Sequence, residues 1–279
     1  GFIRLVVLAR LLAPEDFGLF GIALLSLKTL ETFSVTGIEP ALIQKKENVN
    51  DYLNTAWSIQ IIRGCLLGGI LFIVSPLAAN FFNEQKATML IQVVALSVIL
   101  RDLKNIGVVL FKKEIKFHKE FIFQFCGVIA DFVVSILAAI ILKNAWALIF
   151  GLLSGNVVRL VLSYVLHPYR PSFKMDWEKV KELFTFGRWV FLSAILFFVA
   201  TQGDKIIVGK LLGTIALGTF QLAFLISNMA TTEIMNVASK LMFPVFSKIQ
   251  DNILKLREAF LRTLNLTAFI VIPITAGIL

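Results

Sequence analysis

The sequence predicts an all-α membrane protein, a polytopic bundle of transmembrane helices. Of its 279 residues, 58% are hydrophobic and 16% are charged, and the mean hydropathy is +0.85, values well outside the range of soluble domains. Apolar stretches of about 20 residues, long enough to cross a bilayer core of about 30 Å, recur along nearly the whole chain. They do not alternate apolar and polar residues as outer-membrane strands do, which favours helices.

Seven complete spans and a partial span at each end are expected. The complete spans are 17–38, 53–79, 89–111, 121–142, 145–166, 186–209 and 215–235, and the partial ones are 1–12 and 264–279. The chain has no initiator Met and both ends lie inside apolar runs, so we expect a fragment of a longer transporter rather than a signal peptide at the start.

Lysine and arginine are concentrated on alternate connections between the expected spans. One set of connections carries four, Arg10, Lys86, Lys143 and Lys210. The other set carries sixteen: Lys45, Lys46, Lys112, Lys113, Lys116, Lys119, Arg170, Lys174, Lys179, Lys181, Arg188, Lys240, Lys248, Lys255, Arg257 and Arg262. This asymmetry predicts that the rich side is cytoplasmic. Basic loops beside anionic headgroups also explain the net charge of +9 without nucleic acid.

Residues 10–25 return as a weaker copy at residues 210–225. Arg10 and Lys210 open the two copies, and six identities follow without a gap: Leu11, Leu12, Gly18, Phe20, Ala23 and Leu25 match Leu211, Leu212, Gly218, Phe220, Ala223 and Leu225. Such a repeat favours two related halves, and since both copies run from outside to inside, their axis would follow the membrane normal. The alternative is chance similarity in a Leu-rich chain.

The expected organisation is a six-helix lobe over residues 1–166, a cytoplasmic linker over 167–185 and the start of a second, truncated lobe over 186–279. Residues 176–184 and 248–262 each have an amphipathic pattern. They read equally well as short helices on the cytoplasmic membrane surface or as the wetted ends of long helices.

Ionisable and polar side chains inside the expected spans are the candidates for function, because they are costly at membrane depth. The candidates for a cavity that binds an anionic head group are Arg63, Arg159, Lys28, Arg101 and Asn156. Guanidinium groups suit this role because they stay charged and bind phosphate oxygens bidentately. Arg63 and Arg159 lie mid-span with no obvious partner nearby in sequence.

Asp131 and Glu31 are the candidates for coupling to a proton or sodium ion. Asp131 shares a helical stripe with Gln124 and Ser135. The alternative for all these charges is structural: internal ion pairs, such as Lys28 with Glu31, or side chains that reach out to the membrane surface.

Enzyme and cofactor signatures are absent from the sequence. Residues 203–211 resemble a phosphate-binding loop but have one residue too many between the glycines and a leucine where Ser or Thr is required. His118 and His167 have no nucleophile arranged near them in sequence. Cys65 and Cys126 indicate neither a disulfide framework nor a metal site.

Five segments, 8–19, 37–45, 207–218, 243–251 and 272–277, together resemble the polysaccharide (O-antigen and exopolysaccharide) flippases of the multidrug/oligosaccharidyl-lipid/polysaccharide exporter superfamily. They occur in the expected order over essentially the whole chain. The motif positions are Arg10, Pro14, Gly18, Gly209, Gly213 and Gly218.

The resemblance implies a V-shaped bundle of two pseudo-symmetric lobes in the bacterial inner membrane. It implies translocation of undecaprenyl-pyrophosphate-linked oligosaccharide from the cytoplasmic to the periplasmic face, driven by H⁺ or Na⁺, with membrane lipids and the polysaccharide polymerase machinery as partners. A drug or cation antiporter of the same superfamily is the nearest alternative. A membrane-embedded glycan polymerase or ligase is a further one, but the short outer loops argue against it.

Overall fold

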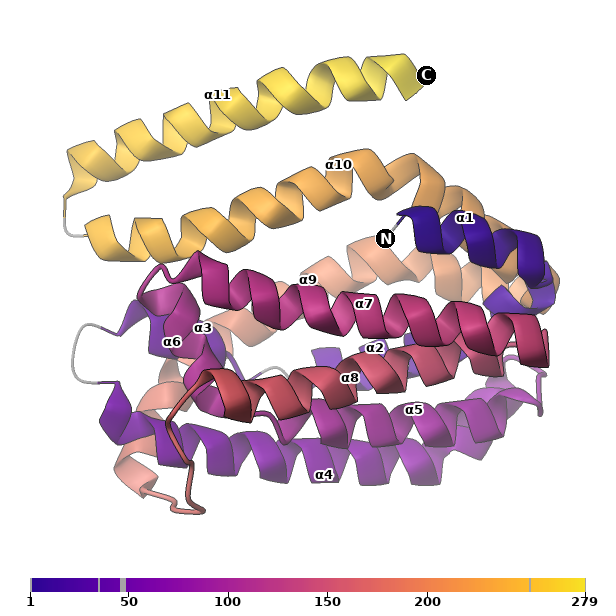
Figure 1. Cartoon of the computed structure of the whole chain (residues 1–279), viewed down its shortest axis with the longest axis horizontal. Helices are drawn as coiled ribbons and strands as arrows, with labels where there is room; N and C mark the ends of the chain where they lie inside the picture. Colours follow the sequence, from indigo (N-terminus) through magenta and orange to yellow (C-terminus); the bar gives the residue numbers. More distant parts are fainter. Residues whose placement is uncertain (1, 35, 46–48, 251, 279) are drawn as a thin grey trace.

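A computed structural model describes residues 2–34, 36–45, 49–250 and 252–278. Side chains are described for these residues except 2–3, 184–190, 225–238, 240 and 274–278. Lys46 and the side chains of Arg188 and Lys240 therefore lie outside the described part. Every regular element in the described ranges is helical, which confirms the all-α prediction, and the long helices run side by side along one axis (Figure 1).

The N-terminal part of the chain contains α1 to α8. The bounds are α1 Phe2–Leu11, α2 Pro14–Thr32, α3 Ile38–Gln44, α4 Asn50–Phe81, α5 Ala87–Asp102, the short 3-10 turn η1 Ile106–Val108, α6 Val109–Lys113, α7 Phe117–Leu142 and α8 Trp146–Leu166. The C-terminal part contains α9 Trp177–Leu211, α10 Gly213–Ile249 and α11 Ile253–Ile278.

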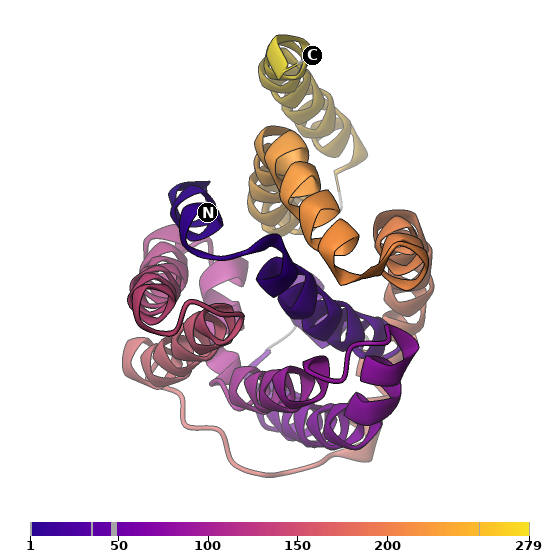
Figure 2. The same ribbon diagram turned by 90° about the vertical axis from the view of Figure 1, so that its right-hand side faces the viewer.

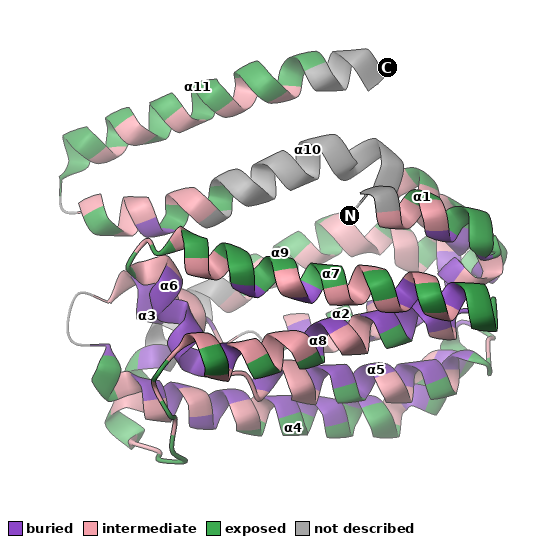
Figure 3. Cartoon of the chain, viewed as in Figure 1, coloured by how far each residue is buried: buried purple, intermediate pink, exposed green. Residues whose placement is uncertain are grey.

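Four described segments are long and apolar enough to cross a membrane. They are Asn50–Phe81, Phe117–Leu142, Trp146–Leu166 and Phe191–Leu211. The outward side of α7 is apolar and exposed at positions that recur about every turn (Figure 3): Phe121, Phe125, Ile129, Val133, Leu137 and Ile141. A continuous exposed apolar face of this length is a lipid-facing surface.

Two expected spans end earlier than their hydropathy predicts. The predicted span 17–38 is wrong at its end, because α2 stops at Thr32 and the backbone turns at Gly37, whose φ of 65° is left-handed. The predicted span 89–111 is also wrong at its end, because α5 stops at Asp102. The side chain of Asn105 then accepts a hydrogen bond from the N–H of Gly107 and starts the 3-10 turn.

The two amphipathic segments are end portions of long helices and not separate short helices. Residues 177–184 are the first turns of α9, whose N-terminus is capped by Asp176 through bonds from the N–H groups of Glu178 and Lys179. Residues 248–262 contain the turn between α10 and α11. The structure therefore decides between the two alternatives that the pattern left open.

The connections rich in lysine and arginine gather at one end of the bundle, which we call the basic end. It contains α3, α6, residues 167–176 and the turn from α10 to α11, on the left of Figure 1. The turns at residues 12–13, 82–86 and 143–145, together with Leu212, lie at the opposite end. This alternation agrees with the topology predicted from charge.

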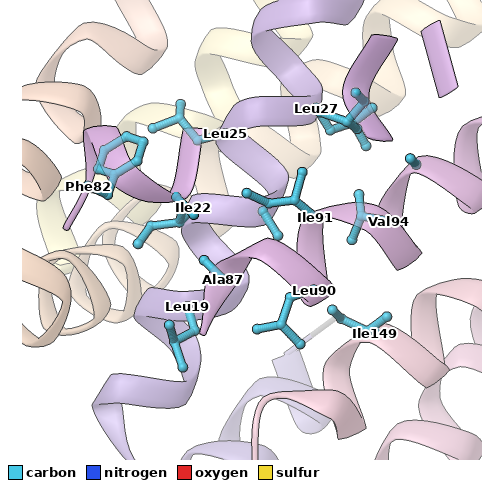
Figure 4. Close-up of a cluster of buried hydrophobic side chains, with 14 of the residues drawn as sticks. Leu19, Ile22, Leu25, Leu27, Phe82, Ala87, Leu90, Ile91, Val94 and Ile149 are labelled. Carbon is cyan, nitrogen blue, oxygen red and sulfur yellow. The ribbon is translucent and has the colours of Figure 1, made fainter. Parts of the chain in front are cut away.

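The main apolar core lies between α2, α4, α5, α8 and α10 (Figure 4). Ile22, Ile91 and Ile149 are completely buried, and Leu217 of α10 is buried in the same cluster. Lipid tails are as apolar as these side chains, so close packing rather than exclusion from water holds such helices together.

The two copies of the repeat pack directly against each other where α2 meets α10 (Figure 2). A Cβ on Gly18 would lie 2.2 Å from the carbonyl oxygen of Thr214, and a Cβ on Gly218 would lie 1.9 Å from that of Pro14. In the repeat numbering 14 matches 214 and 18 matches 218, so the contact is reciprocal. Reciprocal contacts are what a two-fold axis between the copies produces.

Candidate functional site

A cavity of about 660 Å³ lies between the N-terminal part of the chain and α9. It occupies the half of the bundle nearer the basic end, because it is lined by the C-terminal part of α2, the ends of α4 and α5 at that side, and α3. The lining residues are Lys28, Glu31, Thr32, Thr36, Gly37, Ile38, Glu39, Pro40, Gln60, Arg63, Arg101, Asp102, Lys104, Ala194, Phe197, Phe198, Thr201 and Gln202.

Arg63 of α4 lines this cavity, as predicted, but it is not without a partner. Its Nη1 lies 2.9 Å from Oδ2 of Asp102, and its Nε donates to the carbonyl oxygen of Ser34 at 2.8 Å. A cation at this position satisfies backbone carbonyls that the end of α2 leaves without helical partners. Arg63 therefore joins α2, α4 and α5 at the point where α2 breaks.

Glu31 is shared between two cations of the cavity wall. Its carboxylate accepts from Nζ of Lys28 at 2.9 Å and from the guanidinium of Arg101. Arg101 also contacts Asp102, 3.2 Å from Nε to Oδ1. The wall is thus one continuous chain of alternating charges from Lys28 to Arg63. The predicted structural alternative, a Lys28–Glu31 ion pair, is confirmed.

A further pair borders the cavity toward the basic end. Nζ of Lys104 lies 2.6 Å from Oε1 of Glu39. The neighbouring ammonium groups, Lys104 first, lower the pKa of Glu39 to about 2.

Among the described lining residues the charges nearly cancel. Four cations face three carboxylates, so the wall carries a net charge of +1. Lys28 has the most exposed side chain of the ion-paired residues here, at 55%.

The other predicted residues form a separate cluster between α1, α7 and α8. Nη1 of Arg4 lies 2.8 Å from Oδ2 of Asp131, and its Nε donates to Oγ of Ser135 at 3.1 Å. Arg159 donates to Asn156 at 3.4 Å. None of these side chains lines the cavity, so the structure does not bring Arg159, Asn156 and Asp131 together with Arg63.

Glycines make room for these buried charges. A Cβ on Gly127 would lie 2.5 Å from Nε of Arg159, and a Cβ on Gly151 would lie 2.5 Å from Oδ1 of Asp131. Within the described part of the chain both of those polar atoms are buried without a hydrogen-bond partner. Asn156 has a structural contact too, because its side-chain amide donates to the carbonyl oxygen of Ser97.

The motif positions serve the fold and not the cavity. Pro14, Gly18 and Gly218 form the contact between α2 and α10, as described above. Gly209 packs against Phe82, and Gly213 has a φ of 83° in the turn between α9 and α10. Arg10 is exposed in the last turn of α1.

The wall that α9 contributes was not among the predicted site residues. Ala194, Phe197, Phe198, Thr201 and Gln202 line the cavity opposite the charged wall. Their spacing of i, i+3, i+4, i+7 and i+8 marks one helical face. The sequence does show two polar residues, Thr201 and Gln202, in an otherwise apolar helical stripe. Only the fold shows that this stripe faces the cavity.

These features define a multi-pass helical membrane protein with a charged internal cavity. A family profile described as polysaccharide biosynthesis protein matches residues 7–279. The chain therefore belongs to the polysaccharide biosynthesis protein family, which confirms the resemblance at that level.

Curated relatives match the chain over most or all of its length. It is 26% identical to the lipopolysaccharide biosynthesis protein WzxC of Escherichia coli over 281 aligned positions, which cover 100% of this chain and 57% of WzxC. It is 22% identical to the succinoglycan biosynthesis transport protein ExoT of Rhizobium meliloti, over 99% of this chain and 56% of ExoT.

The teichuronic acid biosynthesis protein TuaB of Bacillus subtilis is 23% identical over 87% of this chain and 50% of TuaB. The chain thus spans about half the length of the curated relatives it matches. No solved structure matches it.

Proposed function

We propose that this chain forms part of a flippase that moves an undecaprenyl-pyrophosphate-linked oligosaccharide across the bacterial inner membrane. The protein would act as a transporter and not as an enzyme. The observation that carries the proposal is a cavity lined by charged side chains, between two parts of the chain whose repeated segments pack against each other at the end opposite the basic end. Membership of the polysaccharide biosynthesis protein family supports this substrate class.

The cationic side chains of the cavity wall would receive the pyrophosphate. Lys28 and Arg101 are its best ligands, because both already hold a carboxylate, that of Glu31, at the cavity surface. A pyrophosphate offers the same kind of oxygen acceptor with more charge and can replace Glu31 on the guanidinium. Arg63 would support the site through Asp102.

Alternating access would move residues 1–166 and 186–279 as two lobes. The close contact between α2 and α10 closes the end opposite the basic end. At the basic end the two lobes meet where the side-chain amide of Gln44 donates to Oε1 of Gln250 at 3.2 Å, and the linker joins the first lobe through Lys45 and Glu182 at 2.5 Å. The structure holds both contacts at once, and each would separate in one of the two open states.

Glu31 is the better of the two predicted carboxylates for coupling to H⁺ or Na⁺. When an anionic head group displaces it from Arg101, the released carboxylate lies in the cavity, where a proton or cation can neutralise it. Asp131 stays paired with Arg4 outside the cavity. We therefore propose Glu31 as the coupling residue and Asp131 as part of the helix packing.

The test uses the full-length protein in cells that depend on it for surface polysaccharide. Lys28→Gln and Arg101→Gln should each lower glycan export at least tenfold, while the protein level in the membrane stays unchanged. Lys86→Gln is the matched control, because Lys86 is 74% exposed and pairs with Glu15 away from the cavity. Normal export in both cavity variants would refute the site.

A cation-coupled drug antiporter remains the second candidate function. The observation that favours it is the set of three carboxylates that line the cavity, Glu31, Glu39 and Asp102. It predicts that cells expressing the protein resist cationic dyes and that Glu31→Gln removes the resistance. The flippase proposal predicts no change in dye resistance.

A further inference from the structure

One wall of the cavity differs in chemistry from the rest. Among the residues whose side chains are described, all seven ionisable ones that line the cavity belong to residues 28–104, and α9 contributes none of them. The α9 face instead presents two phenyl rings, one hydroxyl and one amide, from Phe197, Phe198, Thr201 and Gln202. The cavity is therefore divided into a charged side and an aromatic, hydrogen-bonding side.

The orientation of Gln202 is set by its neighbours. Its Oε1 accepts from Nζ of Lys205 at 3.0 Å, and Lys205 also donates to the carbonyl oxygen of Thr201 at 3.2 Å. The ammonium group lies 4.5 Å from the centre of the Phe224 ring, which holds it in place. Among the described residues nothing bonds to the amide nitrogen of Gln202, which leaves two N–H donors for a ligand.

A lipid-facing role does not explain this stripe. Exposed apolar residues of α9 that lie off the stripe, such as Leu196 at 67% and Val199 at 64%, suit contact with lipid. Gln202 does not, because its amide N–H groups would have no acceptor in hydrocarbon, whereas the Thr201 hydroxyl already donates to the carbonyl oxygen of Phe197 at 2.8 Å. Phe197 is 70% exposed and lies on the same face as these polar residues, so its ring borders a space that a polar ligand enters.

A sugar ring matches this combination of groups. A pyranose presents a face of C–H groups, which packs on an aromatic ring, and a rim of hydroxyls, which accept from an amide N–H. A phosphate group has no apolar face and gains nothing from a phenyl ring. The two sides of the cavity thus fit the two parts of a glycosyl pyrophosphate.

We propose that the α9 stripe is a saccharide subsite, in which the sugar next to the pyrophosphate stacks on Phe197 or Phe198 and hydrogen-bonds to Gln202. The proposal rests on the proposed function, because it assumes that the pyrophosphate binds the opposite wall. The α9 stripe then sets the specificity for the sugar, and the charged wall does not contribute to it.

The test measures binding to the full-length protein in nanodiscs with two probes. One is undecaprenyl pyrophosphate, and the other is undecaprenyl pyrophosphate that carries a single hexose. The unchanged protein should bind the hexose-bearing lipid more tightly. Phe197→Leu with Phe198→Leu should reduce the affinity for that lipid roughly three- to tenfold, the usual effect of losing aromatic contacts. Gln202→Leu should act in the same direction, and both should leave the bare lipid unaffected.

Phe125→Leu is the matched control, because Phe125 lies on the exposed face of α7 outside the cavity. Retained binding of the bare lipid shows that each variant is folded. Equal losses for both lipids, or no loss for either, would overturn the saccharide subsite and leave the proposed function standing. Failure of the unchanged protein to bind either lipid would overturn both.

Discussion

Replacing Gly218 with alanine tests whether the contact between α2 and α10 is a closed gate. The new Cβ would lie 1.9 Å from the carbonyl oxygen of Pro14 and 3.0 Å from the backbone nitrogen of Gly18. Both atoms belong to the backbone of α2, so no side-chain rotation relieves the overlap. The helices must separate, or the contact must be abandoned.

The size of the effect follows from the distance. An ordinary contact begins at 3.4 Å, so α10 must move back by about 1.5 Å, the difference from 1.9 Å. Overpacking of this kind costs about 1–3 kcal/mol in a packed interface. A difference of that size between two states shifts their ratio by about 5- to 150-fold. Gly218→Ala should therefore populate an arrangement in which the two helices are apart.

Pulsed electron spin resonance measures this separation. We would attach spin labels at Lys143 and Leu211, which are exposed at the end opposite the basic end and belong to the two different parts of the chain. Cys65 and Cys126 are free and are replaced by serine first. The full-length variant in nanodiscs should gain a longer-distance population that the parent protein lacks.

The reciprocal contact provides a second test variant, and a glycine with no neighbouring atoms provides the control. Gly18→Ala should produce the same longer distance, because its Cβ meets Thr214 at 2.2 Å in the reciprocal contact. Gly69→Ala should change nothing, since no atom lies within 4 Å of its Cβ. If Gly218→Ala and Gly18→Ala both fold and both keep the distance distribution of the parent protein, the contact between α2 and α10 is not a gate.

Two further predictions concern other polar groups. Asp131→Asn leaves the partly buried cations Arg4 and Arg159 without a carboxylate between them, so thermal unfolding in detergent should show a free energy of unfolding lower by about 1–3 kcal/mol. Asp51→Asn, on an exposed helix end, should show almost no change; equal stability of the two variants would contradict the role of Asp131 in the cluster. Burial in the packed linker lowers the pKa of His167 below 6.5. As the pH falls below 6.5, His167 therefore takes up a proton more readily in the opened linker than in the packed one, and the packed linker loses stability. Amide exchange at Tyr169, whose N–H donates to Nδ1 of His167, and at Arg170, corrected for the chemical rate, should then be faster at about pH 5.5 than at about pH 7.5; unchanged protection would contradict this.

The cavity was only partly predictable from the sequence. Lys28, Glu31, Arg63 and Arg101 were identified because charges at membrane depth are costly, and all four line the cavity. Arg159 was selected by the same reasoning and lies in another cluster. Depth along a helix can be read from the sequence, but the side of the helix that faces a cavity cannot.

Ion pairs between different helices could not be predicted from the sequence either. Arg63 and Asp102 are 39 positions apart and pair only because α4 packs on α5. A Cβ on Gly64 would lie 2.6 Å from the Cβ of Asp102, so a glycine permits the approach. Long-range hydrogen bonds also lie just after the ends of α2 and α5, from Arg63 to the carbonyl oxygen of Ser34 and from the N–H of Asn105 to Ser163, and hydropathy had extended both spans beyond these ends.

The sequence by itself determined the helical class, the order of the long helices, the sidedness of the basic loops and the repeat. These are local properties: hydropathy fixes which segments lie in lipid, and charge fixes which loops stay outside it. The tertiary structure alone decided which faces of the helices meet. In a membrane protein the lipid-facing and buried faces are both apolar, so periodicity cannot tell them apart. For that reason the ion-pair chain, the α9 wall and the reciprocal Gly18–Gly218 contact emerged only from the packed bundle.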